Sequence, residues 1–196
     1  QSYQITQWYP KPAVYDWKGW HPMPYLDQGE FYSEFGNFDV RITVPENYIV
    51  AAAGELQNEE ELTKLKQKAE SYERDLKIFI DTKKSLSKKA NPPDSTPVSA
   101  KTTKTLQYKQ NNVHDFAWFA DKRFIVNYDT CRLSSGKIIE VFSYYTSKEK
   151  AVWQNSVTYS KEAVRHYSTL VGEYPYNIVQ VVQGPKSFGG GMEYPT

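Results

Sequence analysis

Residues 38–44, which read FDVRITV, decide the fold class of this chain. Apolar and polar side chains alternate along them, which is typical of an antiparallel strand with one face on the core and one in water. Pro45 and Asn47 interrupt the pattern, and a second apolar run occupies residues 48–52 before Gly54. The two runs predict a hairpin of a β-sandwich. Further strands are expected at residues 106–109, 113–120 and 123–128.

A different periodicity covers residues 59–90. Apolar side chains recur there at spacings of three and four residues, which predicts one long amphipathic helix. Asn58 offers an N-cap, and the acidic residues after it suit the positive end of a helix. The apolar seam consists of Leu62, Leu65, Ala69, Tyr72, Leu76 and Phe79. With the polar, proline-containing residues that follow, this helix forms a predicted insertion at residues 58–104, between two strands of the sandwich.

The order of elements changes in the last third of the chain. Residues 137–145 and 177–183 predict strands. Between them, Thr146 and Glu149 match a capping box at the start of a helix. The fold class is therefore expected to be α+β: a mainly antiparallel β-sandwich with an inserted long helix, followed by a strand–helix–strand unit. The predicted boundary divides the chain into domains at residues 1–133 and 134–196.

Composition restricts the classes of partner. The chain has 196 residues, a net charge of +1 and 24% charged residues, so no strong field is available to attract nucleic acid. No apolar run approaches the roughly 20 residues of a membrane span. The content of 16 Tyr, 9 Phe and 5 Trp suits sheet faces and concave ligand surfaces. Cys131 is the single cysteine, so no internal disulfide can form.

Residues 189–196 read GGGMEYPT and follow an apolar strand. Three consecutive glycines allow another backbone to approach closely, because no Cβ stands in the way. Glu193 lies where its carboxylate could meet a cation beside the strand. The alternative for such a short motif is a glycine-rich turn followed by a solvated glutamate.

The stretch Gly190-Gly191-Met192-Glu193-Tyr194 resembles the G-[AG]-M-E-N motif of the zinc aminopeptidases related to aminopeptidase N and leukotriene hydrolase. Tyr194 stands where that family usually has asparagine. Residues 6–9 (TQWY), with residues 15–16 after them, are similar to the family's T-Q-x-x…(F/Y)-x-x-D segment. Residues 113–118 (VHDFAW) resemble the strand that closes its N-terminal domain. Together these resemblances cover most of the chain outside the predicted insertion.

This resemblance implies a fold and a site. The sandwich would belong to the N-terminal domain of an aminopeptidase, and residues 134–196 would begin a thermolysin-like catalytic domain. Glu193 would bind the free α-amino group of a peptide, through a charge-assisted contact that a blocked amine cannot make. The backbone of Gly190 and Gly191 would align the peptide. The implied substrate-binding residues are Glu193, Gly190, Gly191, Met192, Gln7 and Tyr9.

No zinc site is expected within residues 1–196. The three histidines are His21, His114 and His166, and no H-E-x-x-H motif is present. The resemblance implies that zinc ligands and catalytic groups follow Thr196, so the chain alone is expected to be inactive. The expected partner is a peptide with a free N-terminus. Many bacterial members of the resembled family are exported, which favours a periplasmic or secreted location.

Two departures from the family pattern keep other hypotheses open. Tyr9 occupies a position where the family usually has Glu or Gln, which leaves Gln7 as the nearby residue for a second amine contact. Together with Tyr194, this favours a second hypothesis, a non-catalytic relative that binds peptides or acts as a scaffold. A third hypothesis, an aromatic-rich carbohydrate-binding sandwich, rests on the Trp and Tyr content alone.

Overall fold

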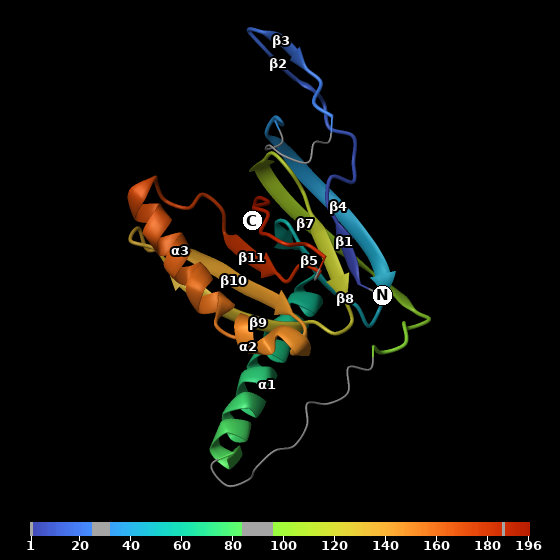
Figure 1. Cartoon of the computed structure of the whole chain (residues 1–196), viewed down its shortest axis with the longest axis vertical. Coiled ribbons are helices and arrows are strands. Elements are labelled where there is room, and N and C mark those ends of the chain that lie inside the picture. Colours follow the sequence, from blue (N-terminus) through green and yellow to red (C-terminus); the bar gives the residue numbers. More distant parts are fainter. Residues whose placement is uncertain (1, 25–31, 84–95, 186) are drawn as a thin grey trace.

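The computed structural model describes residues 2–24, 32–83, 96–185 and 187–196. Its elements are mostly antiparallel strands with few helices, so the predicted α+β class is confirmed. Figure 1 shows a sandwich of strands, a further sheet flanked by helices, and a hairpin that projects from one end.

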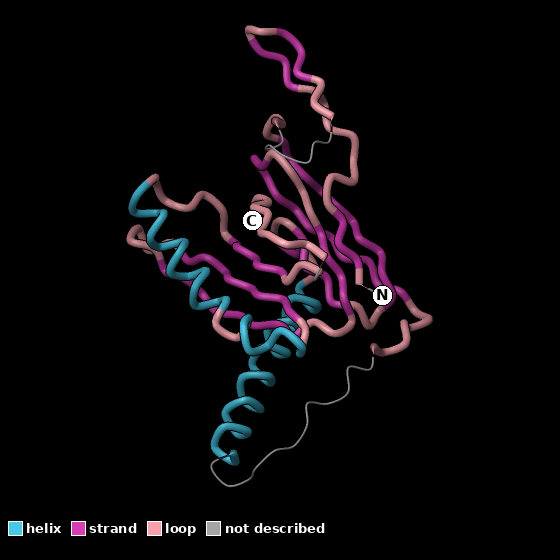
Figure 2. Tube along the Cα trace, in the orientation of Figure 1, coloured by secondary structure: helices cyan, strands magenta, loops and turns pink. Residues whose placement is uncertain are grey.

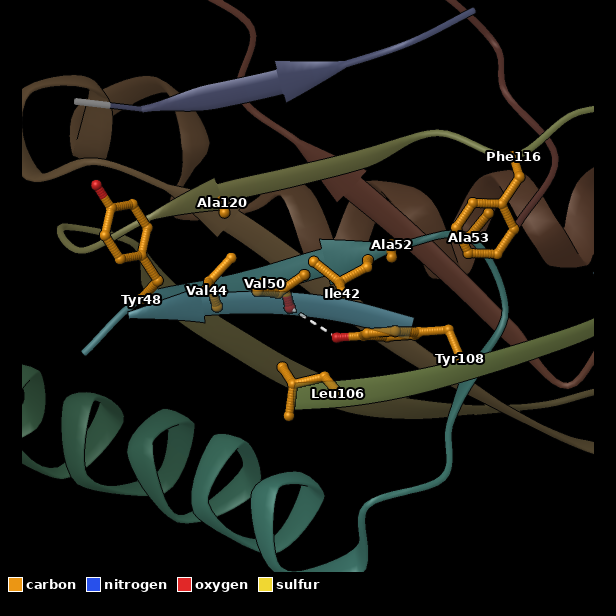
Figure 3. Close-up of a cluster of buried hydrophobic side chains, with 10 residues drawn as sticks. All are labelled: Ile42, Val44, Tyr48, Val50, Ala52, Ala53, Leu106, Tyr108, Phe116 and Ala120. Carbon is orange, nitrogen blue, oxygen red and sulfur yellow. Dashed lines mark hydrogen bonds between the residues drawn. The ribbon is translucent and has the colours of Figure 1, made fainter. Parts of the chain in front are cut away.

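Two three-stranded antiparallel sheets pack face to face and form the sandwich. One sheet has the order β1 (Tyr3–Ile5), β8 (Trp118–Asp121), β5 (Ile49–Ala52). The other has the order β4 (Gly36–Pro45), β7 (Thr103–Val113), β6 (Glu55–Leu56). Figure 3 shows the apolar core between them. There the Tyr108 hydroxyl donates a hydrogen bond to the carbonyl oxygen of Val50 at 3.1 Å, so the buried phenol is satisfied and ties one sheet to the other.

The first two predicted strands do not pair with each other. β4 pairs with β7, and β5 pairs with β8, so the predicted hairpin is wrong. A turn closed by the backbone N–H of Tyr48 and the carbonyl oxygen of Pro45, at 3.0 Å, carries the chain from one sheet to the other. The apolar faces of β4 and β5 therefore meet across the core. Alternation predicts a buried face but does not say which strand lies beside which.

A third sheet has the order β9 (Ile125–Arg132), β10 (Ile138–Tyr145), β11 (Ile178–Val182). β9 and β10 are antiparallel, whereas β10 and β11 are parallel. The turn at residues 133–137, where the sequence places the domain boundary, joins two paired strands, so this sheet begins before that boundary. Helices α1 (Glu59–Lys83) and α3 (Ser156–Leu170) cover its two faces, as Figure 1 shows.

The predicted long helix is confirmed over α1, and its seam packs into the core. Leu65 and Ala69 are buried against side chains of β5, β9 and β10. α1 and the segment after it join β6 to β7, which are neighbours in one sheet, so the predicted insertion between two sandwich strands is confirmed. The predicted continuation to residue 90 and the side chains of Leu76 and Phe79 lie outside the described residues.

The connection between β10 and β11 starts differently from the prediction. Thr146 does not cap a helix with its side chain. Its backbone N–H and its hydroxyl both donate to Oε1 of Gln183, at 2.7 and 3.1 Å. The predicted capping box is therefore wrong, because the hydroxyl is committed to the residue that follows β11. A 3-10 turn (Ser147–Glu149) and a short helix α2 (Lys150–Trp153) precede α3.

The projecting hairpin in Figure 1 consists of β2 (Val14–Asp16) and β3 (Gly19–His21). Oδ1 of Asp16 accepts a hydrogen bond from the backbone N–H of Lys18 and lies 2.8 Å from Nε2 of His21. These contacts, that of His21 first, hold the pKa of Asp16 below its ordinary value. Trp17 and Trp20 are exposed, so polar contacts at the turn, more than a core, fix the hairpin.

Candidate functional site

A groove of about 1140 Å³ lies where the sandwich, β11 and the last residues of the chain meet. Residues 189–196 line it together with residues of β5 and β11 and with Gln4 and Thr6. Figure 2 shows residues 189–196 within a loop beside the strands, without regular secondary structure. Four of the predicted site residues line this groove: Gly190, Gly191, Met192 and Glu193.

One side of the groove is an open strand edge. β11 is the edge strand of its sheet, and in a parallel ladder alternate residues direct their backbone groups toward and away from the neighbour. The carbonyl oxygen of Asn177 accepts a hydrogen bond from β10, and the N–H of Gln183 donates one to β10, both at 2.8 Å. Gln180 and Val182, which line the groove, therefore direct their backbone N–H and C=O groups away from β10. An extended peptide can add to such an edge as a further strand.

Gly54 joins the sandwich to both β11 and the last segment. The side-chain amide of Gln180 donates to the carbonyl oxygens of Ala52 at 2.5 Å and of Gly54 at 3.4 Å. The N–H of Gly54 donates to Oγ1 of Thr196 at 2.8 Å. Gly54 has φ +88°, and a Cβ there would lie 2.6 Å from the carbonyl oxygen of Lys109, so no larger residue fits. The sequence showed Gly54 only as the end of a strand, because this crowding comes from the distant strand β7.

Glu193 presents a carboxylate that has no counter-charge among the described residues. Its side chain is exposed, and among the residues that the structure describes no hydrogen bond or ion pair engages it. Its Oε1 lies 3.6 Å from the position that a Cβ on Gly191 would take, so glycine there leaves space beside the carboxylate. Apart from the chain neighbours, no atom of the described residues lies within 4 Å of the corresponding positions on Gly189 and Gly190. The carboxylate can therefore accept charge-assisted hydrogen bonds from a cation that enters the groove.

The other two predicted substrate-binding residues, Gln7 and Tyr9, are not among the residues that line the groove. Both contact the carboxylate of Asp115. Nε2 of Gln7 donates to Oδ2, and the Tyr9 hydroxyl donates to Oδ1 at 3.3 Å. Lys11 forms an ion pair with Oδ2 at 2.7 Å. In this structure the side chains of Gln7 and Tyr9 are committed within the chain, and their contact with substrate stays a prediction.

Asp115 is the centre of this cluster, and sequence reasoning missed it. It falls in the predicted strand at residues 113–120, but β7 ends at Val113 and β8 begins at Trp118, so that strand is broken at residues 114–117. The residue is 2% exposed, and Oδ1 also accepts a hydrogen bond from the N–H of Phe116 at 2.7 Å. The available signal was an acidic residue next to an apolar run. Such a residue is expected to be buried, and a buried carboxylate requires hydrogen-bond donors from elsewhere in the chain.

Tyr9 serves this cluster as a donor. Its burial raises the pKa of the phenol, and the charge of Asp115 and the hydrogen bond to it raise the pKa further. The hydroxyl therefore keeps its proton at neutral pH. The Tyr9 ring also packs edge-on against Phe38, with centroids 5.5 Å apart, so the aromatic contact and the hydrogen bond fix one orientation.

No metal centre is found among the described residues: no three or more His, Cys, Asp or Glu side chains gather there to hold an ion. His21 pairs with Asp16 on the hairpin, and the His114 ring packs against Phe35. The described part of the chain therefore does not fit zinc. Within the same ranges, no helix combines the length and apolar character needed to cross a membrane.

Comparison with known proteins finds likeness among solved structures and no match by sequence. No protein family model matches the sequence, and no curated protein matches it. Among solved structures, the chain is similar to a two-domain M1 zinc metallopeptidase, a mutant bound to L-arginine, with 15% identity and a TM-score of 0.45. The match covers 76% of this chain, which spans 26% of the length of that metallopeptidase chain. At this level the comparison does not establish a family.

Proposed function

We propose that this chain is part of a zinc-dependent aminopeptidase and that its groove holds the N-terminal end of a peptide. One observation carries the proposal: Glu193, a carboxylate without a counter-charge among the described residues, stands on a glycine-flanked segment that lines the groove. A carboxylate forms a stronger hydrogen bond with an ammonium group than with a neutral donor. The sequence motif around Glu193 supports the same assignment.

The groove also supports a mode of binding. The peptide backbone would lie along the open edge of β11 and exchange hydrogen bonds with Gln180 and Val182. Gly190 and Gly191 would allow its first residue to approach without steric hindrance. Glu193 would then accept hydrogen bonds from the terminal ammonium. A peptide with an acetylated N-terminus brings no positive charge to this position and would bind less well.

The described residues do not supply the zinc ligands or the general base, and we expect these groups after Thr196. The division at residue 134, the thermolysin-like character of the second part, and export from the cell remain predictions. If the intact protein bound peptides but hydrolysed none, the same groove would belong to a non-catalytic peptide-binding relative.

Kinetics of the intact enzyme test this assignment. In Glu193→Gln, loss of the charge should raise KM for unblocked aminoacyl substrates by about 10- to 100-fold, since a hydrogen bond to a charged group contributes roughly 1.5–3 kcal/mol. Glu173→Gln is the matched control, because Glu173 is exposed and is not among the groove residues. Unchanged KM and kcat in Glu193→Gln would refute the role of Glu193.

A further inference from the structure

The buried carboxylate of Asp115 holds one short stretch of chain by several contacts at once. Its two oxygens accept hydrogen bonds from the side chains of Gln7 and Tyr9 and form an ion pair with Lys11. They also accept a hydrogen bond from the backbone N–H of Phe116. The contacts join positions more than 100 residues apart in sequence. A carboxylate that is 2% exposed and so fully occupied fixes its partners firmly, because each lost contact would leave a desolvated polar group.

The stretch that Asp115 holds is further secured by its neighbours. The indole N–H of Trp8 donates to the carbonyl oxygen of Phe116 at 2.9 Å. Gln7 has φ +51°, a left-handed conformation that is unfavourable for a residue with a side chain. Such a conformation persists only when surrounding contacts impose it. The amide contact to Asp115 is one contact that holds Gln7 in this state.

Both chain segments attached to this cluster line the groove. Gln4 and Thr6 precede Gln7 in the chain, and Ala117 and Phe119 follow Phe116. Gln4 and Phe119 are also paired across β1 and β8. A shift at Asp115 would therefore move two neighbouring parts of the groove lining, although Asp115 itself is not in the groove.

We infer that Asp115 is a positioning residue. It lies outside the groove lining and holds residues 7–11 in place, so that Gln4 and Thr6 keep their positions in the lining of the groove. The inference rests on the proposed function, because the groove matters only if a peptide occupies it. Gln7 and Tyr9 then act on peptide binding through Asp115, by fixing the backbone, and not as direct contacts to the amine.

The test measures the affinity of the chain of residues 1–196, which alone is expected not to hydrolyse peptides, for a tetrapeptide amide with a free N-terminus. The affinity is measured by calorimetry. Asp115→Asn keeps the size of the side chain but removes its charge and places an N–H₂ where donors now point. We expect about tenfold weaker binding, in the range that a displaced groove lining can cost. Gln7→Ala removes a single contact and should weaken binding by a smaller factor. The double variant should be no weaker than Asp115→Asn, because the two act through one contact.

Asp129→Asn is the matched control. Asp129 forms an ion pair with Lys161 of α3, away from the groove. The affinity of Asp129→Asn for the tetrapeptide amide should stay within about twofold of the wild-type affinity. If Asp115 has only a structural role, Asp115→Asn and Gln7→Ala will lower the melting temperature but leave the affinity of the folded protein unchanged, which overturns the inference.

Hydrogen exchange separates this inference from the proposed function. In Asp115→Asn and in Gln7→Ala, the amides of residues 4–8 should exchange about tenfold faster, while amides of β9 and β10 stay protected. If the wild type bound no peptide, the proposed function would fail, and this faster exchange would still support the positioning role. Unchanged exchange at residues 4–8 would refute the positioning role whatever the peptide result.

Discussion

Asp115 and Glu193 carry the same chemical group in opposite surroundings. Asp115 is 2% exposed and accepts contacts from side chains of the N-terminal segment and from the backbone N–H of Phe116. Glu193 is exposed on a loop, and nothing in the described residues pairs with it. A carboxylate that the chain satisfies itself contributes to the scaffold. A carboxylate that the chain leaves open, in a groove with a free strand edge, is available to a ligand.

The supports of the two regions differ as well. The Asp115 cluster lies between two strands of the sandwich and is backed by the aromatic rings of Tyr9, Phe38 and Phe116. The last segment has no regular structure and is tied to the sandwich through the hydrogen bond between Gly54 and Thr196. The stability of the fold should therefore depend more on the first region, whereas direct contact with a ligand should come from the second.

The largest effect is expected for Asp115→Ala. The substitution leaves the donors of Gln7, Tyr9 and Lys11 without their acceptor, and breaking a buried ion pair in this way costs about 3–5 kcal/mol of the free energy of unfolding. Urea denaturation measures the loss. Asp129→Ala is the control, because its ion pair is half exposed on the carboxylate side and should cost less than about 1 kcal/mol. Equal losses in the two variants would contradict the claim that the fold depends on the buried carboxylate of Asp115.

Gly54→Ala should come next, with a loss of about 2–4 kcal/mol from a positive φ and steric overlap together. Gly136→Ala is a close control, because Gly136 has φ +92° but no atom within 4 Å of its Cβ position. That variant should lose only about 1–2 kcal/mol, the cost of the left-handed backbone. The difference between the two, measured by chemical denaturation, reports the crowding against β7. If both variants were equally destabilised, crowding against β7 would not be what requires glycine at position 54.

A smaller effect should appear at alkaline pH. Because the pKa of Tyr9 is raised in the folded protein, the unfolded chain loses this proton first as pH rises through the ordinary value of 10.0. The contribution of Tyr9 to the free energy of unfolding is therefore fully present below that pH and is lost as the pH rises above it. The stability of the wild type should fall more steeply there than that of Tyr9→Phe, as denaturant unfolding at several pH values would measure. Parallel curves would mean that the pKa of Tyr9 is not raised in the folded protein.

The smallest effect is expected for Glu193→Gln. An exposed side chain without partners in the described structure should change the free energy of unfolding by no more than about 0.5 kcal/mol. A thermal melt of the variant beside the wild type measures it. A loss above about 1 kcal/mol would show that Glu193 belongs to the scaffold, like Asp115.

Local patterns in the sequence predicted much of the fold. Alternation at residues 38–44 indicated a strand with one buried face, and the seam through Leu65 and Ala69 indicated the helix that covers the third sheet. Pairing was not predictable in the same way. The partners of β4 and β5 are the distant strands β7 and β8, with paired residues as far apart in sequence as Gly36 and Val113.

The residues that line the candidate groove were predictable only where one continuous motif contained them. Residues 190–193 do line a groove, whereas Gln7 and Tyr9 turn to a carboxylate more than 100 residues away in sequence. The crowding at Gly54 and the orientation of the Gln180 amide also arise from contacts between distant segments. No local periodicity encodes such contacts.

The most direct test of the central claim compares a tetrapeptide amide carrying a free N-terminus with its acetylated twin, by calorimetry on the wild type and Glu193→Gln. We predict that the wild type binds the free amine about tenfold or more tightly than the acetylated peptide, as one charge-assisted hydrogen bond allows. Glu193→Gln should bind the two peptides equally. Equal binding of both peptides by the wild type, or an unchanged preference in the variant, would contradict the assignment of Glu193 as the ammonium-binding residue.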